Sequence, residues 1–235
     1  MGFQPGSFPI FDTVAKTALI IGTTGLVGEQ CLNELLLSNA YEKVIALTRK
    51  KLEVQNSKFE NILTDFEDAE TLKPLLKADD VFCALGTTIA KAGSQAAFRK
   101  VDYEIPLQIA ELALHNGATQ FILVSSLGAD ATSSFFYSKV KGELETALQK
   151  MKFDSLLIFR PSILLGDRNE QRLGEEVGKF FAEKLTFLFA GPLKKYKGTP
   201  ANLLAKTMVN VAQEKGKGVR IIENVEIFEI SKKHS

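Results

Sequence analysis

Two residues of types that carry acid-base chemistry, Tyr137 and Lys141, stand four positions apart in the sequence Tyr-Ser-Lys-Val-Lys. In a helix, residues with this spacing lie on one face, so the phenol and the ammonium would be neighbours. A phenol with a pKa of about 10 is a poor proton carrier at neutral pH, but a nearby ammonium stabilises the phenolate. The pair is therefore a candidate for moving a proton to or from a substrate.

A Tyr and a Lys four residues apart can occur by chance, so the spacing alone is weak evidence for a catalytic pair. The position of the pair in the chain is stronger evidence. It follows the apolar run at 121–124, which is typical of a buried strand and ends in Ser125 and Ser126. The carboxyl ends of parallel strands form the edge at which doubly wound sheets hold their ligands. A serine there can donate a hydrogen bond to a substrate oxygen as charge develops on it.

A glycine pattern, Gly22-x-x-Gly25-x-x-Gly28, stands between an apolar run and a segment of helical period. The first glycine allows a tight turn, the second lets backbone N–H groups approach a pyrophosphate, and the third lets the helix pack against the strand. The helix N-terminus adds a partial positive charge. The alternative is that the glycines serve only the turn. We expect this loop to bind a dinucleotide through Gly22, Thr24, Gly25, Leu26, Val27 and Gly28.

The residues after the second apolar run bear on which dinucleotide binds. NAD sites usually place an acidic residue at the end of the second strand, whereas the 2′-phosphate of NADP needs a cation there. The run at 44–47 continues into a turn of three cations that includes Arg49, while Glu42 precedes the run and belongs to the opposite end of the strand. A guanidinium binds phosphate through a bidentate fork and stacks on adenine. We expect NADP rather than NAD, with a solvated basic turn as the alternative reading of Arg49.

Short apolar runs alternate with segments of helical period through most of the chain. This alternation predicts a doubly wound α/β fold, in which a parallel sheet lies between two layers of helices. One helical stripe ends at Asn116-Gly117, a helix stop signal. The six expected strands lie at 19–21, 44–47, 62–63, 81–85, 121–124 and 156–159.

The alternation is expected to stop after Arg160, where a stretch rich in glycine and charge leads into a Phe-rich segment at 180–189. That segment is either an amphipathic helix packed on the core or a cap that lines an apolar substrate pocket. We expect a single domain over 1–235, with a dinucleotide-binding core at 15–160 and a short C-terminal cap at 161–200. Residues 1–14 resemble a surface leader without an assigned role.

Composition narrows the class of partner. The 235 residues carry 29 Lys plus Arg against 28 Asp plus Glu, and 45% of them are hydrophobic. Such a chain can bury roughly 70–75% of its unfolded surface without a metal or a disulfide. Balanced charge argues against a nucleic-acid or anionic-membrane binder. We expect a small-molecule substrate, with a homodimer or a protein partner as possibilities.

The two cysteines, Cys31 and Cys83, are far apart in apolar segments, and the chain has only two histidines. These residues build neither a zinc site nor a disulfide framework, so we expect no metal and two buried, reduced thiols. No segment reaches the roughly 18 apolar residues of a membrane span, and the N-terminus lacks a secretory pattern. We expect the protein in the cytoplasm.

Together these motifs resemble the short-chain dehydrogenase/reductase superfamily, and the resemblance covers nearly the whole chain beyond residue 15. Further segments resemble its atypical subgroup, which includes the HIV Tat-interacting protein and its bacterial relatives. Two features depart from the classical members: an Asn-x-x-Gly motif is absent after the fourth strand, and Ser126 and Tyr137 are only 11 positions apart. The segments that carry the resemblance, besides the glycine pattern and the Tyr137/Lys141 pair, are Leu63-Thr-Asp65-Phe66, Leu85-Gly-Thr-Thr88, Val101-Asp102-Tyr103, Ser125-Ser-Leu-Gly-Ala-Asp130 and Arg160-Pro-Ser-Ile-Leu-Leu-Gly166.

The resemblance implies a Rossmann fold that binds NADP(H). It implies Tyr137 as general acid/base, Lys141 as the residue that holds the ribose and tunes Tyr137, and Ser126, with Ser125 as fallback, as the residue that orients the substrate oxygen. It places Asp65 and Phe66 near the adenine, although Asp65 could instead cap a helix. It further implies cofactor contacts from Ala84, Leu85 and Gly86 at the ribose and from Pro161, Ser162 and Ile163 at the nicotinamide.

The sequence therefore predicts an NADP-dependent oxidoreductase that moves a hydride between the nicotinamide and a carbonyl or alcohol carbon. One alternative is a non-catalytic NADP(H)-binding regulator or protein-interaction scaffold. The other is a sugar-nucleotide epimerase or dehydratase, which ranks last because such chains usually carry a larger C-terminal substrate domain.

Overall fold

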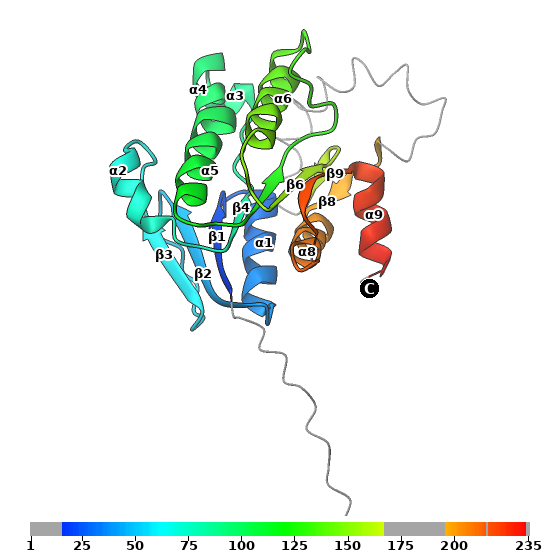
Figure 1. The fold of residues 1–235 in the computed structure, drawn as a ribbon. Helices are drawn as coiled ribbons and strands as arrows, with labels where there is room; N and C mark the ends of the chain where they lie inside the picture. The colour runs from blue at the N-terminus through cyan, green and yellow to red at the C-terminus, as the bar shows by residue number, and fades with distance from the viewer. Residues whose placement is uncertain (1–15, 167–195, 215, 234–235) are drawn as a thin grey trace, which may run out of the picture.

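The computed structural model describes residues 16–166, 196–214 and 216–233 of the chain. Its centre is a seven-stranded sheet in the order β3-β2-β1-β4-β5-β6-β9 (Figure 1), and all neighbouring strands are parallel. The chain starts in the middle of the sheet, runs outward to β3, and then returns to β4 on the other side of β1. The strands are β1 (Lys16–Ile21), β2 (Tyr41–Thr48), β3 (Phe59–Leu63), β4 (Asp80–Cys83), β5 (Gln120–Val124), β6 (Ser155–Arg160) and β9 (Gly218–Glu223).

Helices cover both faces of this sheet, which gives three layers (Figure 1). One face packs against α1 (Leu26–Leu37), α8 (Ala201–Ala212) and α9 (Asn224–Lys233). The other face packs against α2 (Ala69–Leu72), α5 (Ile105–His115) and α6 (Phe136–Gln149). The shorter elements are α3 (Ile89–Ala92), α4 (Gln95–Arg99), the 3₁₀ turn η1 (Lys73–Leu75), the π-helical turn η2 (Lys100–Glu104) and a separate parallel pair, β7 (Leu164–Leu165) with β8 (Thr199–Pro200).

The buried strands separate two apolar cores. In β1, Ile20 packs in the core under α1 and α8, whereas Leu19 and Ile21 pack in the core under α5 and α6. This alternation follows from the pleat, because successive side chains of a strand point to opposite faces. Strands that are apolar on both faces require helices on both sides. The structure confirms the expected doubly wound, three-layer fold.

The expectation that strand-helix alternation stops after Arg160 is wrong. The strand β9 continues the main sheet, pairing from Ser155↔Gly218 to Arg160↔Glu223. It was missed because it lies at the edge of the sheet, where Val219 is 49% exposed, and a short, half-exposed strand gives a weak hydropathy signal. The leader at 1–14 and the Phe-rich segment at 180–189 lie outside the described residues.

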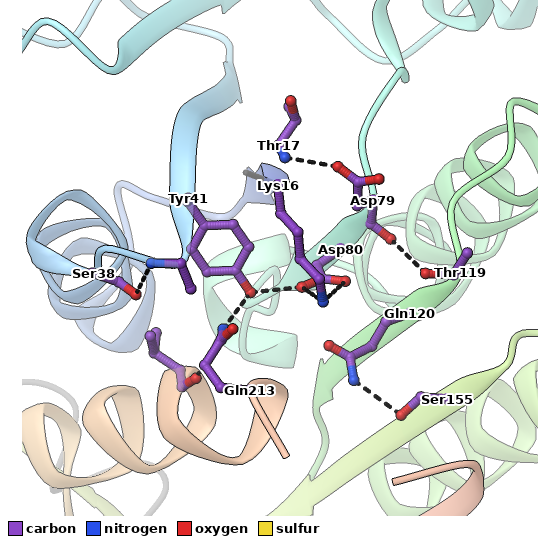
Figure 2. A network of polar contacts seen from close by, with 12 residues as sticks. Lys16, Thr17, Ser38, Tyr41, Asp79, Asp80, Thr119, Gln120, Ser155 and Gln213 are labelled. Carbon is purple, nitrogen blue, oxygen red and sulfur yellow. Dashed lines mark hydrogen bonds and ion pairs between the residues drawn. The ribbon is translucent and has the colours of Figure 1, made fainter. Parts of the chain in front are cut away.

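A network of polar side chains joins four elements at the amino edge of the sheet (Figure 2). The Tyr41 hydroxyl donates to Asp80 Oδ2 at 2.7 Å and accepts from Gln213 Nε2 at 2.8 Å. Lys16 Nζ lies 3.0 Å from the same Asp80 oxygen. Burial is the largest influence on Asp80 and raises its pKa, against the opposing effects of Tyr41 and Lys16. The network lies at the opposite edge from the ligand-binding ends of the strands, so we assign it to stability.

Both cysteines, Cys31 and Cys83, are free thiols buried in the core, as expected. Within the described residues, no helix has the length and apolar character needed to cross a membrane. The same part of the chain holds no cluster of three or more His, Cys, Asp or Glu side chains suited to a metal ion.

Candidate functional site

The residues expected to bind cofactor gather at the carboxyl edge of the sheet. From β1 the chain adds β2 and β3 on one side of the sheet, and from β4 onward it adds strands on the other side. The carboxyl ends of β1 and β4 therefore mark the topological switch point of the fold. Each of the first six strands ends one or two positions before one of the expected residues, in the order Gly22, Arg49, Asp65, Ala84, Ser125 and Pro161.

The glycine loop is shaped by two close backbone approaches. Gly22 has a φ of 87°, and a Cβ on it would collide with the backbone of Ala84. A Cβ on Gly28 would collide with the carbonyl of Gly22, while the Gly25 N–H donates to that carbonyl at 2.9 Å. These glycines let the first turn of α1 lie directly against β1 and let the loops after β1 and β4 touch.

The same loop presents polar groups that fit a dinucleotide phosphate. Gly25 is the N-cap of the 12-residue helix α1 and supplies no side-chain cap, so the N–H groups of the first turn are available to an anion. The Thr23 hydroxyl is buried and has no hydrogen-bond partner among the described residues. A buried polar atom without a partner is costly unless a ligand or water satisfies it.

The turn after β2 holds Arg49 at the carboxyl edge. The Thr48 hydroxyl donates to the carbonyl of Lys50 at 2.7 Å, and Asn61 Nδ2 donates to that hydroxyl at 2.8 Å. Asn61 Oδ1 also accepts from the Leu52 N–H at 2.8 Å. Arg49 itself is exposed, so its guanidinium is accessible to a phosphate in solution.

The turn after β3 carries Asp65 and Phe66. Asp65 is exposed and accepts a hydrogen bond from the Glu67 N–H at 3.0 Å. The residue that caps α2 is Asp68, which accepts from Glu70, so the alternative reading of Asp65 as a helix cap is wrong. Phe66 is buried with a φ of 66°, a conformation that is rare for an aromatic residue and marks a turn held by its surroundings.

Tyr137 and Lys141 both lie in helix α6, one turn apart, as the spacing predicts. The Tyr137 ring is half-buried and packs on the ring of Phe98, with the ring centroids 5.5 Å apart. The Lys141 side chain is only 5% exposed. A buried ammonium needs a counter-charge.

That counter-charge is Asp102, whose role the sequence did not reveal. Lys141 Nζ lies 2.8 Å from Asp102 Oδ1, and the Asp102 side chain is fully buried. Burial alone would lower the pKa of Lys141, but the charges of Asp102 and Tyr137 outweigh it and raise that pKa. Asp102 stands in the middle of the π-helical turn η2, a local geometry common at functional sites. The sequence signal that could have indicated a buried role for Asp102 is its place as an acidic residue in an otherwise apolar helical stripe.

The loop after β4 lies directly on this ion pair. The Asp102 carboxylate accepts from the Thr87 N–H at 2.9 Å through its other oxygen. A Cβ on Gly86 would stand 3.4 Å from Asp102 Oδ1 and 3.6 Å from Lys141 Nζ. The Leu85-Gly-Thr-Thr88 motif is thereby joined to η2 and α6.

The two serines after β5 have different surroundings. The Ser125 hydroxyl donates to Glu145 Oε1 at 2.5 Å, and Glu145 also pairs with Arg160. Glu145 is one turn beyond Lys141, on the same face of α6. The Ser126 hydroxyl has a longer contact, 3.4 Å, to the carbonyl of Leu127. Ser125 is therefore committed to the protein, and Ser126 is the serine better able to contact a substrate.

The short loop between Ser126 and Tyr137 folds back onto α6. The Asp130 N–H donates to the carbonyl of Ser138 at 3.0 Å. A Cβ on Gly142 would collide with the backbone of Asp130 and Ala131. The absence of that atom lets the loop approach the turns of α6 that carry Tyr137 and Lys141.

The turn after β6 is tied to its neighbours. The Pro161 carbonyl accepts from the Leu127 N–H at 2.8 Å. The Ser162 N–H donates to Asn224 Oδ1 at 3.2 Å, and its hydroxyl donates to the Lys197 carbonyl at 2.5 Å. The Ser162 side chain is thus held by the protein, and contacts from this turn to a nicotinamide, Ile163 included, stay a prediction.

Two hollows on the described surface lie away from the Tyr137/Lys141 pair. One, of about 220 Å³, lies between α1, α8 and α9; the other, of about 430 Å³, lies beside Phe66 and the start of α5. Neither is lined by Tyr137, Lys141 or the glycine loop, so neither adds to the acid-base site.

With this geometry in place, a protein-family model described as NAD(P)H-binding matches residues 22–182, from the first glycine of the loop onward. The chain belongs to this family. Protein HTATIP2 of Rattus norvegicus is 37% identical over 94% of this chain and 92% of its own length. Protein FMP52-1, mitochondrial, of Scheffersomyces stipitis is 36% identical over 92% of this chain and 99% of its own. The resemblance to the atypical short-chain dehydrogenase/reductases is confirmed.

Solved structures of other proteins share the fold of this chain. The oxidoreductase ylbE of Lactococcus lactis has a TM-score of 0.65 at 18% identity, over 92% of this chain and 95% of that one. A UDP-N-acetylglucosamine 4-epimerase of Methanobrevibacter ruminantium has a TM-score of 0.66 at 17% identity, over 89% of this chain and 76% of that one. At such identities the likeness concerns the fold alone.

The relatives correct the expected location. FMP52 proteins of Scheffersomyces stipitis, Candida albicans and Emericella nidulans are all named mitochondrial. The expectation of a cytoplasmic protein is wrong on this finding, because the relatives point to mitochondria. The sequence offered only the lack of a secretory pattern and of an apolar span, and neither of these separates the two compartments.

Proposed function

We propose that this member of the NAD(P)H-binding family is an NADP-dependent oxidoreductase that interconverts a carbonyl and an alcohol. The observation that carries the proposal is the Tyr137/Lys141 pair on α6, with Lys141 buried, charged and held beside the loop after β4. A bound nicotinamide would supply or accept the hydride. The chain's own residues would bind the cofactor, orient the substrate and move the proton.

Each residue has a distinct part in this proposal. The Tyr137 hydroxyl donates a proton to the substrate oxygen during reduction, and the Tyr137 phenolate accepts the proton of the alcohol during oxidation. The Lys141 ammonium holds the ribose and acts on Tyr137 as the positive end of its ion pair with Asp102, which favours the phenolate. The Ser126 hydroxyl donates a hydrogen bond to the oxygen on which charge develops.

The decisive test measures turnover in Tyr137→Phe. We expect kcat for NADPH-dependent reduction of a panel of carbonyl compounds to fall by about 100-fold or more, while the Kd for NADPH changes little. Tyr103→Phe is the matched control, because that ring contacts Arg99 rather than Lys141. Full turnover in Tyr137→Phe would reject the assigned role. A native chain that binds NADPH but reduces no carbonyl would favour the cofactor-binding regulator or scaffold.

The preference for NADP rests on the exposed Arg49 after β2. In Arg49→Ala we expect the Kd for NADPH to rise by about 10-fold or more, since charge-assisted hydrogen bonds to phosphate contribute about 1.5–3 kcal/mol. The Kd for NADH should rise much less, because NADH lacks the 2′-phosphate and would lose only the stacking of the guanidinium on adenine. Lys51→Ala, which removes an exposed cation from the same turn, is the control. Equal affinity for both dinucleotides in the native chain, unaffected by Arg49→Ala, would overturn the preference.

A sugar-nucleotide epimerase is separated from an oxidoreductase by the fate of the cofactor. An epimerase regenerates its dinucleotide within each turnover, whereas the proposed reaction consumes NADPH in proportion to product. The loss of NADPH absorbance with a carbonyl substrate therefore distinguishes the two activities.

A further inference from the structure

The Lys141–Asp102 ion pair is almost fully buried among the residues that the structure describes. Its side chains are 5% and 0% exposed, respectively. Gly86 covers the pair from the loop after β4, and Thr87 donates its N–H to the second Asp102 oxygen at 2.9 Å. An ion pair so placed is fixed in geometry and weakly screened by solvent.

We propose that Asp102 is a positioning residue that fixes Lys141 under the Gly86–Thr87 turn and cancels its charge, so that the site can hold both the oxidised and the reduced nicotinamide. The inference rests on the proposed function, since it concerns the same cofactor. An oxidised nicotinamide ring carries a positive charge and a reduced ring carries none. A lone ammonium in the site would repel only the oxidised form, whereas a neutral ion pair treats both forms alike.

The ionisable groups that act on Lys141 come from three elements. They are Asp102 from η2, Tyr137 from α6 and Cys83 from β4. Burial raises the pKa of Cys83 to about 11, so this thiol is neutral between pH 6 and pH 9. Asp102 is the nearby carboxylate that balances the ammonium, and its loss would leave Lys141 as an uncompensated buried cation.

The test compares the Kd of NADP⁺ with the Kd of NADPH by titration calorimetry, from pH 6 to pH 9. In the native chain we expect the ratio of the two constants to stay nearly constant over this range. In Asp102→Asn, which keeps an acceptor for the Thr87 N–H, NADP⁺ should weaken relative to NADPH by about five-fold or more at the acidic end. The ratio should return toward the native value at the alkaline end, where the uncompensated Lys141 loses its proton.

Two further variants keep the inference open to refutation if Asp102→Asn folds poorly. Lys141→Met should move the ratio in the opposite direction, in favour of NADP⁺, because it leaves the carboxylate without its cation. The double variant Asp102→Asn/Lys141→Met should restore the native ratio, since both charges are gone. Glu143→Gln is the control, because it removes a carboxylate of the same helix that pairs instead with Arg99.

The results separate the two proposals. If the native chain binds neither form of the cofactor, the proposed function fails. If the native chain binds both forms and every variant weakens both to the same degree, the function survives and Asp102 is merely structural. A ratio within two-fold of the native value at all pH values in Asp102→Asn would overturn the charge-balancing role.

Discussion

Ser125 and Ser126 are adjacent in the chain but make different contacts. Ser125 belongs to a hydrogen-bonded group in which the buried Glu145 also pairs with Arg160. The Ser126 hydroxyl instead makes a long contact, 3.4 Å, to the carbonyl of Leu127. We therefore expect the Ser125 hydroxyl to contribute to stability and the Ser126 hydroxyl to catalysis, and removing one hydroxyl at a time tests this division.

We expect Ser126→Ala to lower kcat by about 10-fold to 100-fold and to leave the free energy of unfolding within about 0.5 kcal/mol of the native value. Ser125→Ala should instead lower the free energy of unfolding by about 1–3 kcal/mol, because Glu145 loses a donor in a buried site. Urea unfolding and steady-state kinetics on both variants measure the two effects. The reverse pattern would exchange the roles of the two serines.

At the scale of elements, the network in Figure 2 fastens β1, β2, β4 and the end of α8 at the amino edge of the sheet. Its centre is the buried carboxylate of Asp80, whose pKa is raised chiefly by burial. An acid whose pKa is raised by folding adds stability below its unfolded pKa of about 3.9, and that stability is lost as the pH rises through the folded pKa. The network therefore makes stability depend on pH.

Tyr41→Phe tests this dependence. The variant removes a hydrogen bond that lowers the pKa of Asp80, so the folded pKa of Asp80 should rise further. We expect a loss of about 1–3 kcal/mol in the free energy of unfolding at pH 7 and a smaller loss near pH 4, where Asp80 is closer to its protonated form. Urea unfolding at both pH values, with Tyr103→Phe as control, measures the difference. An equal loss at both would show that Asp80 is not the group responsible.

The elements that could be predicted from the sequence are those marked by a local pattern of apolar residues. Buried parallel strands such as β1 and β5 are short and apolar on both faces, and the face of α6 that carries Tyr137 and Lys141 follows from helical period alone. The edge strand β9 is half-exposed and so lacks this signal. The pairing of β9 with β6 is shown only by the three-dimensional arrangement.

The positions of the site residues in the fold could be predicted, but the contacts between their side chains could not. Its residues follow the ends of strands, so the alternation of elements brings the glycine loop, Arg49 and Ser126 to one edge. The contacts between side chains were not predictable, because Lys141 with Asp102 and Ser125 with Glu145 depend on how α6 packs against η2 and β5. From the sequence, Asp102 was identified only as part of a family motif. No simple sequence pattern predicts the π-helical turn in which it is buried.

At the scale of the whole molecule, the proposed cofactor site uses the same elements that hold the fold together. The glycine loop leads from β1 into α1, and the loop over Lys141 follows the end of β4. A ligand that binds only the folded chain stabilises all of it. A single domain over 1–235 and a homodimer or a protein partner stay predictions.

The reactivity of the two cysteine thiols can be used to measure how far cofactor binding stabilises the fold. Cys31 is on the buried face of α1 in one core, and Cys83, at the end of β4, lies in the core on the other face of the sheet. Both are fully buried, and burial raises the pKa of each. A thiol reagent that needs an accessible thiolate therefore reacts only after the surrounding layers open.

We expect both cysteines to react slowly with a disulfide reagent in the native chain and rapidly in denaturant. NADPH at 100 times its Kd should slow both native reactions by about 100-fold, because opening the layers around either thiol disrupts an element that holds the cofactor. Labelling followed by mass spectrometry gives the two rates separately. If NADPH slows Cys83 but leaves Cys31 unchanged, α1 opens without releasing the cofactor, and the glycine loop does not carry the binding energy assigned to it.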